Sequence, residues 1–228
     1  MSGQPAIVDA FYGGERAAEA LAAVLFGTYN PSGKLPVTMY PQEFMRDNPL
    51  PHMSVSAPPG RTHLHYTGTP EFAFGAGLSY SSWRVDVQRA ATTLAAGGAA
   101  TYSVQLTNLG PYSGRQRVLG FARPKRGARA SATAPRQLLW GYRGVELAVG
   151  GAATLSFELG ASQLAQANEA GERVLHPGEY EVVFSDGSAA EVSAGTLTVT
   201  GAPTVVEASA FRRAALQPQQ PLVETAAS

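Results

Sequence analysis

Hydrophobic and polar residues alternate along most of the second half of the chain. From Trp83 onward, apolar side chains recur at every second position in several short segments, a pattern typical of β-strands with one buried face. Glycine-rich turns separate these segments. We expect strands within residues 83–87, 102–106, 118–121, 138–142, 155–159, 180–184 and 197–199.

The number and spacing of these strands indicate the fold class. About seven short antiparallel strands within about 115 residues favour a mainly β structure, a β-sandwich of the immunoglobulin or fibronectin type III kind. We place this domain at residues 83–200. Tyr180 follows a Pro-Gly-Glu turn, where a tyrosine corner would pin one edge of the sandwich. An ordinary core tyrosine explains the same position equally well.

The first forty residues change their hydrophobic period twice. Residues 6–8 form a short apolar run, residues 17–25 place apolar side chains at the helical spacing i, i+3, i+4 and i+7, and residues 35–40 return to a β-type pattern. Gly27 suits the left-handed residue that commonly ends a helix. Strand, helix and strand make the smallest piece of an α/β layer, which cannot form a sheet alone.

Residues 1–82 are therefore interpreted as the C-terminal remnant of an α/β sandwich domain plus a connecting segment. The connecting part, 41–82, is rich in proline and glycine and is expected to be mostly irregular, with short strands around 62–66 and 71–74. Beyond the sandwich, residues 201–228 turn to Ala, Pro and Gln. Their low hydrophobicity predicts a disordered tail.

Composition narrows the function classes. Lysine plus arginine (17) equals aspartate plus glutamate (17), so no net charge draws the chain to nucleic acid or to anionic lipid. The absence of cysteine excludes disulfides and thiolate chemistry. The sequence contains no apolar run long enough to span a membrane, and its first five residues lack the features of a signal peptide. A soluble protein without nucleic-acid or membrane partners is expected.

Acidic residues are the first candidates for chemistry, because glycoside hydrolysis usually needs two carboxylates that flank the scissile bond. No pairing is evident from their positions, and the pair at Glu15 and Glu19 fits a solvated helix face. We therefore assign no catalytic residue. The acids considered are Asp9, Glu15, Glu19, Glu43, Asp47 and Glu71.

Two further patterns have a functional and a structural interpretation. Gly13-Gly14 before the helix could present backbone N–H groups to an anion, but a tight strand-to-helix turn explains the pair as well. His63 and His65 lie two positions apart, so on a strand both rings would share one face and form half of a metal site. No third ligand follows nearby. We assign no metal and no cofactor, and expect the histidines to pack beside Arg61.

The predicted sandwich carries two candidate binding features. The loop 123–129 holds four cations and no acid, so it could meet phosphate or an acidic glycan, or be a solvated loop. Trp140 and Tyr142 are two residues apart and could form a sugar-stacking platform on one strand face. Core packing of these aromatic residues is the alternative.

A series of motifs in order resembles the C-terminal region of glycoside hydrolase family 3, especially plant-type β-xylosidases and related arabinofuranosidases. The motifs are Val24-Leu25-Phe26-Gly27-Thr28-Tyr29-Asn30-Pro31-Ser32-Gly33-Lys34-Leu35-Pro36-Val37-Thr38, Pro59-Gly60-Arg61-Thr62, Tyr66-Thr67-Gly68 and Phe74-Gly75-Ala76-Gly77-Leu78-Ser79-Tyr80. The second half is similar to the fibronectin type III-like domain of that family, through Gln137-Leu138-Leu139-Trp140-Gly141-Tyr142 and Leu175-His176-Pro177-Gly178-Glu179-Tyr180. The resemblance covers about residues 1–200.

The resemblance implies an enzyme of three parts: a barrel with a nucleophilic aspartate, an α/β sandwich with an acid/base glutamate, and the fibronectin-like domain. Both catalytic carboxylates of the family lie upstream of the part matched here, so no position in this sequence inherits either role. The chain is expected to be a C-terminal fragment or a truncated gene product that is inactive alone and needs an upstream barrel. Family resemblance also implies an extracellular or cell-wall location and a role in xylan catabolism.

A second hypothesis belongs to a different class of function. The sandwich could act as a stand-alone module that holds polysaccharide or oligosaccharide on the basic loop near Lys125 or on the face of Trp140 and Tyr142. Exposed aromatic rings or a clustered basic face would support it.

Overall fold

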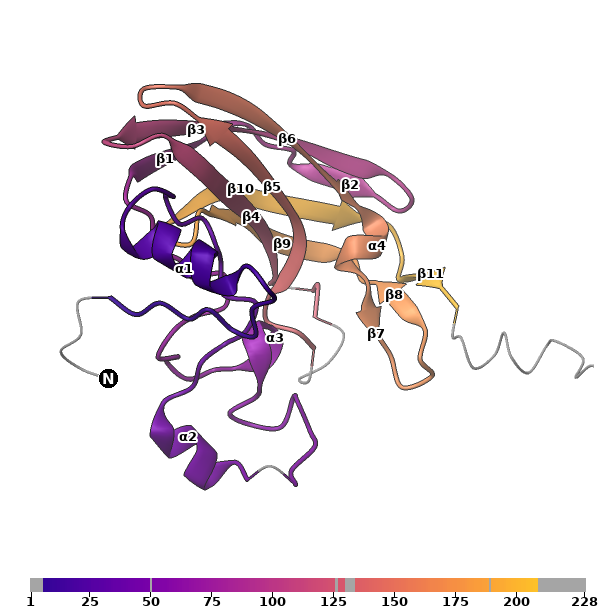
Figure 1. The fold of residues 1–228 in the computed structure, drawn as a ribbon. Helices are drawn as coiled ribbons and strands as arrows, with labels where there is room; N and C mark the ends of the chain where they lie inside the picture. The colour runs from indigo at the N-terminus through magenta and orange to yellow at the C-terminus, as the bar shows by residue number, and fades with distance from the viewer. Residues whose placement is uncertain (1–5, 50, 126, 130–133, 189, 209–228) are drawn as a thin grey trace, which may run out of the picture.

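The computed structural model describes residues 6–49, 51–125, 127–129, 134–188 and 190–208. Most of the described chain forms a β-sandwich, in which a sheet of three strands in the order β1-β3-β6 faces a sheet of five in the order β2-β10-β9-β4-β5 (Figure 1). A small third sheet, β11-β8-β7, lies at one end. The strands are β1 (Ser82–Arg89), β2 (Thr93–Ala95), β3 (Ala99–Gly110), β4 (Gly114–Pro124), β5 (Leu138–Leu147), β6 (Ala152–Gly160), β7 (Gln166–Ala167), β8 (Arg173–Leu175), β9 (Gly178–Ser185), β10 (Glu191–Thr200) and β11 (Thr204–Glu207).

The alternating segments supply the core between the two sheets. In β3, for example, burial follows strict alternation, and Tyr102, Val104 and Leu106 have no exposed surface. Four aromatic rings meet at the centre of this core, with centroids 5.0 to 5.9 Å apart across the contacts among them. Such edge and tilted ring contacts add to the burial of apolar surface. The rings belong to Tyr102, Trp140, Phe157 and Phe184. The predicted fold class is confirmed.

Tyr180 forms a tyrosine corner, one of the two arrangements that its position in the sequence allowed. Its side chain is fully buried, and its hydroxyl donates a hydrogen bond of 2.8 Å to the backbone carbonyl of His176, four residues upstream. Burial raises the pKa of the Tyr180 hydroxyl to about 12, so the group remains a donor at neutral pH. The tyrosine-corner interpretation therefore describes this residue better than a core tyrosine without a specific role.

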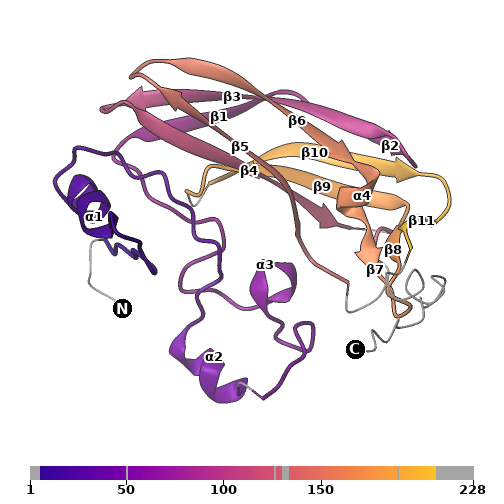
Figure 2. The ribbon, with the colours of Figure 1, turned by 45° about the vertical axis from the view of Figure 1, so that its right-hand side comes forward.

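The described residues before Ser81, 6–49 and 51–80, form a loosely structured segment along the sandwich, the N-terminal segment (Figure 2). These described residues contain three helices, α1 (Ala17–Leu25), α2 (Gln42–Asp47) and α3 (Thr62–His65), while α4 (Ala161–Leu164) lies within the sandwich domain. The predicted helix is confirmed, but residues 6–8 form no strand, and the predicted strands at 35–40 and 71–74 are reduced to a single bridge between Met39 and Phe72. These strand predictions were wrong because 35–40 and 71–74 pair only with each other, through a few backbone hydrogen bonds such as Met39 N–H to the Phe72 carbonyl over 2.9 Å, and no further strand of the described chain extends them into a sheet.

Two other strand assignments differ from expectation. Residues 62–66 contain the short helix α3 instead of a strand. The predicted disordered tail begins too early, because β11 pairs antiparallel with β8 and its Glu207 carboxylate lies 3.3 Å from the Arg173 guanidinium. Residues 209–228 of the predicted tail lie outside the described residues. Within the described part of the chain, no helix has the length and apolar character needed to cross a membrane.

Asn30 ties its turn to the chain that leads into β1 and, through its amide, to the Ser113 carbonyl of the sandwich. Its side chain is buried, and its carbonyl oxygen accepts hydrogen bonds of 2.9 Å from both the Ser79 hydroxyl and the Tyr80 backbone N–H. A second fastening is the guanidinium of Arg117 on β4, which donates to the backbone carbonyl of Ser32 over 2.7 Å. The turn that carries Asn30 and Ser32 is thereby held against the first strands of the sandwich.

Candidate functional site

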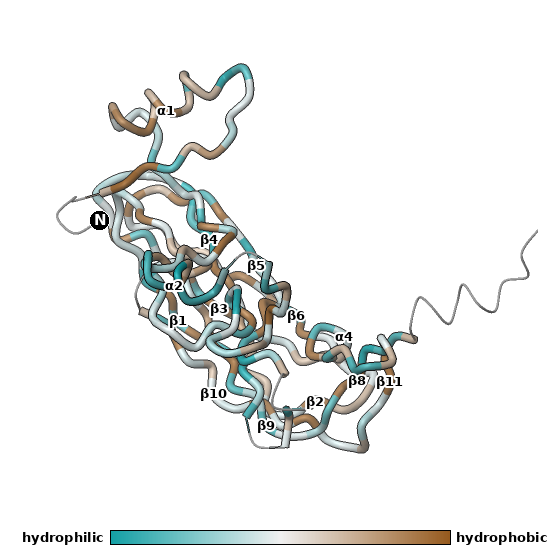
Figure 3. Tube along the Cα trace, turned by 90° about the horizontal axis from the view of Figure 1, so that it is seen from below, coloured by the Kyte–Doolittle hydropathy of each residue, from teal (hydrophilic) through white to brown (hydrophobic). Residues whose placement is uncertain are grey.

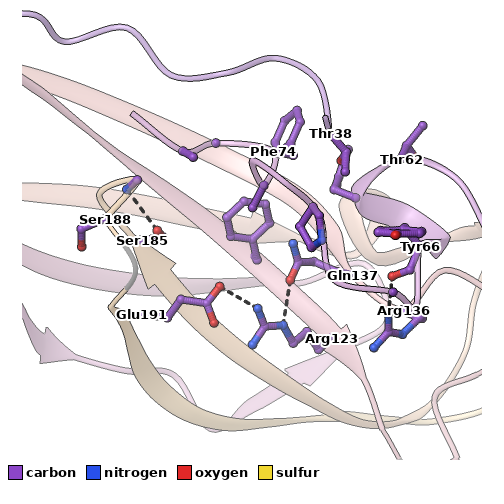
Figure 4. Close-up of a pocket in the computed structure, with 18 residues that line it drawn as sticks. Thr38, Thr62, Tyr66, Phe74, Arg123, Arg136, Gln137, Ser185, Ser188 and Glu191 are labelled. Atoms are coloured by element: carbon purple, nitrogen blue, oxygen red, sulfur yellow. Dashed lines mark hydrogen bonds and ion pairs between the residues drawn. The ribbon is translucent and has the colours of Figure 1, made fainter. Parts of the chain in front are cut away.

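A half-open cleft of about 510 Å³ lies where the N-terminal segment meets the five-stranded sheet (Figure 4). Thr38, the α3 region and Phe74 form the side contributed by the N-terminal segment, while β4, β9, β10 and the chain before β5 form the other. The side chains that line the cleft include Thr38, Phe74, Arg123, Arg136, Gln137 and Glu191.

Phe74 anchors the N-terminal segment on the outer face of the sheet. Its ring lies 6.3 Å from that of Phe121 and packs on a small apolar cluster that includes Leu119 and Val183. The next residue, Gly75, has a φ of +83°, and a Cβ there would lie 2.6 Å from Leu119 Cδ1. Glycine therefore permits both the left-handed backbone and the close approach that place Phe74 in the cleft.

A polar network crosses the sandwich side of the cleft. Arg123 Nε donates to Gln137 Oε1 over 2.8 Å, and Arg123 Nη2 lies 2.7 Å from Glu191 Oε1. The side chains of Arg123 and Glu191 are 30% and 38% exposed, so the ion pair is only partly screened by solvent. Glu191 supplies the one carboxylate that lines the described cleft.

The α3 region forms the other rim. The backbone N–H of Arg136 donates to the Leu64 carbonyl over 2.7 Å, and the Arg136 guanidinium donates to the Tyr66 carbonyl. The His63 ring stacks on Phe74 with centroids 4.0 Å apart. Burial, with a smaller contribution from the neighbouring His65, lowers the pKa of His63 below its usual value. His63 is therefore neutral at pH 7 and forms part of an aromatic wall.

Lys34 lies near Gly187, where the N-terminal segment meets the five-stranded sheet. Its ammonium donates to the Gly77 carbonyl over 3.0 Å. Burial lowers the pKa of this amine to about 8, although the charge of the buried Asp186 nearby opposes the shift. No sequence pattern points to this lysine, because its burial depends on the sandwich folding against the turn that carries it.

The structure does not bring the acidic candidates together. All six are exposed, and Glu19 makes only a long contact of 3.9 Å with Arg16 on the surface of α1. None lines the cleft. The six are Asp9, Glu15, Glu19, Glu43, Asp47 and Glu71. A retaining glycosidase needs carboxyl groups about 5 to 5.5 Å apart in one pocket. The cleft in the described chain does not offer that arrangement.

The histidine pattern has a structural explanation. His63 and His65 belong to helix α3 and not to a strand, so residues two apart point in different directions. Thr62 begins this helix with a φ of +58°, and its backbone N–H donates to the Tyr40 hydroxyl over 2.6 Å. The described residues contain no group of three histidine or acidic side chains placed to hold a metal ion. The half-site hypothesis is therefore wrong.

The glycine pair behaves as a turn. A Cβ on Gly13 would lie 2.2 Å from Ala17 Cβ, so the first glycine is required for the close approach of the chain to the start of α1. Gly14 accepts a hydrogen bond of 3.0 Å from the backbone N–H of Ala17 through its carbonyl. The tight-turn interpretation describes these contacts.

The described cationic side chains of loop 123–129 form ion pairs and hydrogen bonds with other residues of the chain. Arg123 pairs with Glu191, Lys125 Nζ lies 3.3 Å from Glu181 Oε2, and Arg129 donates to a backbone carbonyl. Arg126 lies outside the described residues. The contacts of the three described cations favour a structural loop over an open phosphate site.

Trp140 and Tyr142 do not form a platform. Phe121 pairs with Leu139 and Gly120 pairs with Gly141, so Trp140 is an extra residue in β5. This bulge sends Trp140 into the core, where it is 5% exposed, while Tyr142 is 62% exposed opposite Leu119 on the outer face. The predicted shared face is wrong because a bulge reverses the alternation.

Comparisons with known proteins agree with the observed architecture. Residues 2–80 match the model of the glycosyl hydrolase family 3 C-terminal domain, and residues 120–188 match that of the fibronectin type III-like domain. Probable beta-D-xylosidase 7 of Arabidopsis thaliana is 33% identical over 210 residues, which cover 79% of this chain and 27% of the relative. The beta-xylosidase of Formosa agariphila is 32% identical over 203 residues, covering 86% and 27%.

The solved structures show the same fold. A family 3 exo-beta-xylosidase, XlnD, superposes with a TM-score of 0.73 at 23% identity and covers 86% of this chain and 28% of that structure. The chain thus spans about 27% of the length of the two curated relatives, and it corresponds to their C-terminal portion. The resemblance noted from the motifs is confirmed.

Proposed function

We propose that this chain, which belongs to glycoside hydrolase family 3 as its C-terminal part, serves as the C-terminal portion of a β-xylosidase-like enzyme. In this role it completes an α/β domain and braces the fibronectin-like sandwich against an upstream catalytic barrel. The reaction of the complete enzyme is retaining hydrolysis of terminal xylosyl or arabinosyl residues during xylan catabolism, acting outside the cell or in the cell wall.

The apolar surface of the N-terminal segment is the observation that carries this proposal. None of the residues of α1 is buried, and Leu25 and the adjoining Phe26 are 60% and 85% exposed. Figure 3 shows α1 and its flanking chain projecting from one end of the molecule, with many hydrophobic positions. Leu25, Phe26 and a groove of about 480 Å³ between α1 and residues 8–14 form a surface that we call the N-terminal apolar face.

An exposed apolar face of this kind indicates a surface that is covered by a partner. The occupant we propose is the upstream part of the same enzyme, which makes up most of the length of the relatives. Ile7 and Val8, 47% and 50% exposed, have the apolar character of a strand that lacks a neighbouring strand. Docking would convert this extended segment into the edge or interior of the α/β sheet.

The division of the enzyme into an upstream part and this C-terminal part also determines where the catalytic carboxylates lie. Cleavage of the sugar linkage requires a nucleophilic carboxylate and an acid/base carboxylate within one pocket. The family places both upstream of the matched segment, and the cleft in the described chain contains a single acid, Glu191. The chain alone is therefore proposed to be inactive.

Two measurements test the proposal. The purified chain is incubated with 4-nitrophenyl β-D-xyloside, and no turnover is expected; turnover that a single Asp or Glu substitution abolishes would overturn the proposal. In a chimera, this chain replaces the matching C-terminal segment of the Formosa agariphila β-xylosidase, and hydrolysis of the same substrate is expected.

A matched pair of variants shows whether the N-terminal apolar face docks in that chimera. Phe26 and Met53 are almost equally exposed, at 85% and 86%, but Phe26 adjoins α1 and belongs to the N-terminal apolar face, whereas Met53 does not. Phe26→Asp should destabilise the chimera by about 2 kcal/mol, since a phenyl group buried by docking is replaced by a charge. Met53→Asp should leave its melting temperature nearly unchanged. Equal effects of the two substitutions would contradict docking through this face.

A further inference from the structure

We propose that the cleft between Phe74 and the Arg123–Gln137–Glu191 network is a binding site for a neutral saccharide unit of a polysaccharide chain. The site is built from the N-terminal segment and the sandwich together. Its position was not evident from the sequence, because Phe74 and Glu191 are far apart along the chain.

The polar side of the cleft offers both donors and acceptors. Arg123 donates to the amide oxygen of Gln137 and to one of the two carboxylate oxygens of Glu191. The Gln137 amide nitrogen and Glu191 Oε2 make no hydrogen bond with any other described residue. A sugar hydroxyl both donates and accepts, so adjacent hydroxyls can accept from the amide and donate to the carboxylate. The hydrogen bond from Arg123 to Gln137 and the ion pair of Arg123 with Glu191 fix both groups before a ligand arrives.

The opposite side of the cleft is aromatic. Phe74 is half-buried and is held by its contact with Phe121, while His63 stacks on it with an interplanar angle of 23°. This arrangement makes a rigid apolar wall, against which the C–H face of a sugar ring can pack. Small-ligand pockets combine such an apolar wall with a few convergent polar groups, and their volumes of about 300 to 1,000 Å³ include that of this cleft.

The charges that line the cleft almost balance. Glu191 neutralises Arg123 at a distance of 2.7 Å, and Arg136, which donates to the Tyr66 carbonyl at the rim, leaves one positive charge in the lining. His63 carries no charge at pH 7, because burial lowers its pKa. A phosphate or sulfate group would therefore meet the Glu191 carboxylate without a free cluster of cations.

Thr38 also lines the cleft, and its hydroxyl oxygen is buried without a hydrogen-bond partner among the described residues.

The test is a titration of the intact, isotopically labelled chain with xylotetraose, followed by amide chemical shifts. The choice of this sugar rests on the proposed function; the location of the site does not. Shifts are expected to cluster at residues 62–66, 74–76, 136–137 and 185–191 and to saturate with a dissociation constant in the millimolar range. No shift up to about 20 mM, or shifts centred elsewhere, would overturn the proposal.

Three variants sharpen the test. Gln137→Glu keeps an acceptor for Arg123 but removes the two amide donors, and Phe74→Leu keeps an apolar side chain but removes the flat ring. Each is expected to weaken binding about tenfold, as for the loss of one good contact. Tyr142→Leu removes an exposed ring outside the cleft and should bind as the parent does. A loss with Tyr142→Leu alone would move the site to the outer face of β5 and refute the cleft.

Gln137→Glu also covers the case in which Phe74→Leu does not fold, because Gln137 is not part of the apolar cluster. The outcomes separate the two proposals. If the chimera hydrolyses the xyloside while the chain binds no xylotetraose, only the cleft is refuted. If the chain binds xylotetraose in the cleft while the chimera is inactive, only the proposed enzymatic role is refuted.

Discussion

Replacing Asn30 with alanine should loosen the attachment of its turn to residues 79–81, which lead into β1, and to Ser113 of the sandwich. Its carbonyl oxygen accepts two hydrogen bonds of 2.9 Å, from Ser79 and from the Tyr80 backbone, and its amide makes two longer contacts of 3.3 and 3.4 Å to Ser81 and Ser113. Asn30 is 8% exposed, so water cannot easily replace these partners. The two short bonds alone are worth about 1 to 3 kcal/mol.

We therefore expect Asn30→Ala to lower the free energy of unfolding by about 2 kcal/mol, or the melting temperature by about 4 to 8 °C for a domain of this size. Urea unfolding followed by tryptophan fluorescence measures the first quantity, and Trp83 is a suitable reporter because its indole N–H donates to Ser79 over 3.1 Å. Hydrogen exchange at the Tyr80 amide should become faster, because this amide loses its acceptor.

Asn48 provides the matched control. It is equally buried, at 8%, but its amide nitrogen bonds within its own helix, to the Phe44 carbonyl over 3.1 Å. Asn48→Ala should therefore cost about 1 kcal/mol and leave the exchange of the Tyr80 amide unchanged. The reasoning fails if Asn30→Ala unfolds within about 0.5 kcal/mol of the parent, or if Asn48→Ala accelerates exchange at Tyr80 to the same extent.

Two further predictions concern buried polar groups. Tyr180→Phe removes a 2.8 Å hydrogen bond and should cost about 1 kcal/mol in urea unfolding, more than Tyr102→Phe, whose hydroxyl contact is 3.4 Å long; equal losses would argue against the corner. For Lys34, the folded pKa of about 8 lies below its ordinary 10.5, so the unfolded chain binds more protons between these values and the stability should rise with pH. Denaturant unfolding between pH 7.5 and 9.5 should show that rise in the parent and a weaker one in Lys34→Met; identical slopes would exclude Lys34 as its source.

Alternation of apolar residues was enough to predict the sandwich, since the long strands pack one face against the opposite sheet. Val104 on β3 and Phe157 on β6, for example, both point into the core. The shortest strands were missed, because β2 and β7 are too brief to show a period. They form only because a longer neighbour, such as β10 for β2, supplies hydrogen-bonding partners.

The errors at single residues have local causes that periodicity does not reveal. One extra residue at Trp140 reverses the alternation along β5, so Tyr142 faces the other way. The positive φ at Thr62, with a backbone N–H bonded to Tyr40, starts a helix where the pattern favoured a strand. Both features depend on contacts with residues that are distant in sequence.

The cleft could not be predicted for a related reason: its polar network joins β4, β10 and the chain before β5, and its aromatic wall comes from the N-terminal segment. The same geometry links the two proposals. Contacts that fasten the N-terminal segment to the sandwich, such as Gly77 to Gly187 and Arg136 to Leu64, also fix the distance between the two walls of the cleft. Docking of the N-terminal apolar face on an upstream domain would restrain the same segment from its other end. The width of the cleft, and with it the affinity for a saccharide, should therefore depend on whether that face is covered.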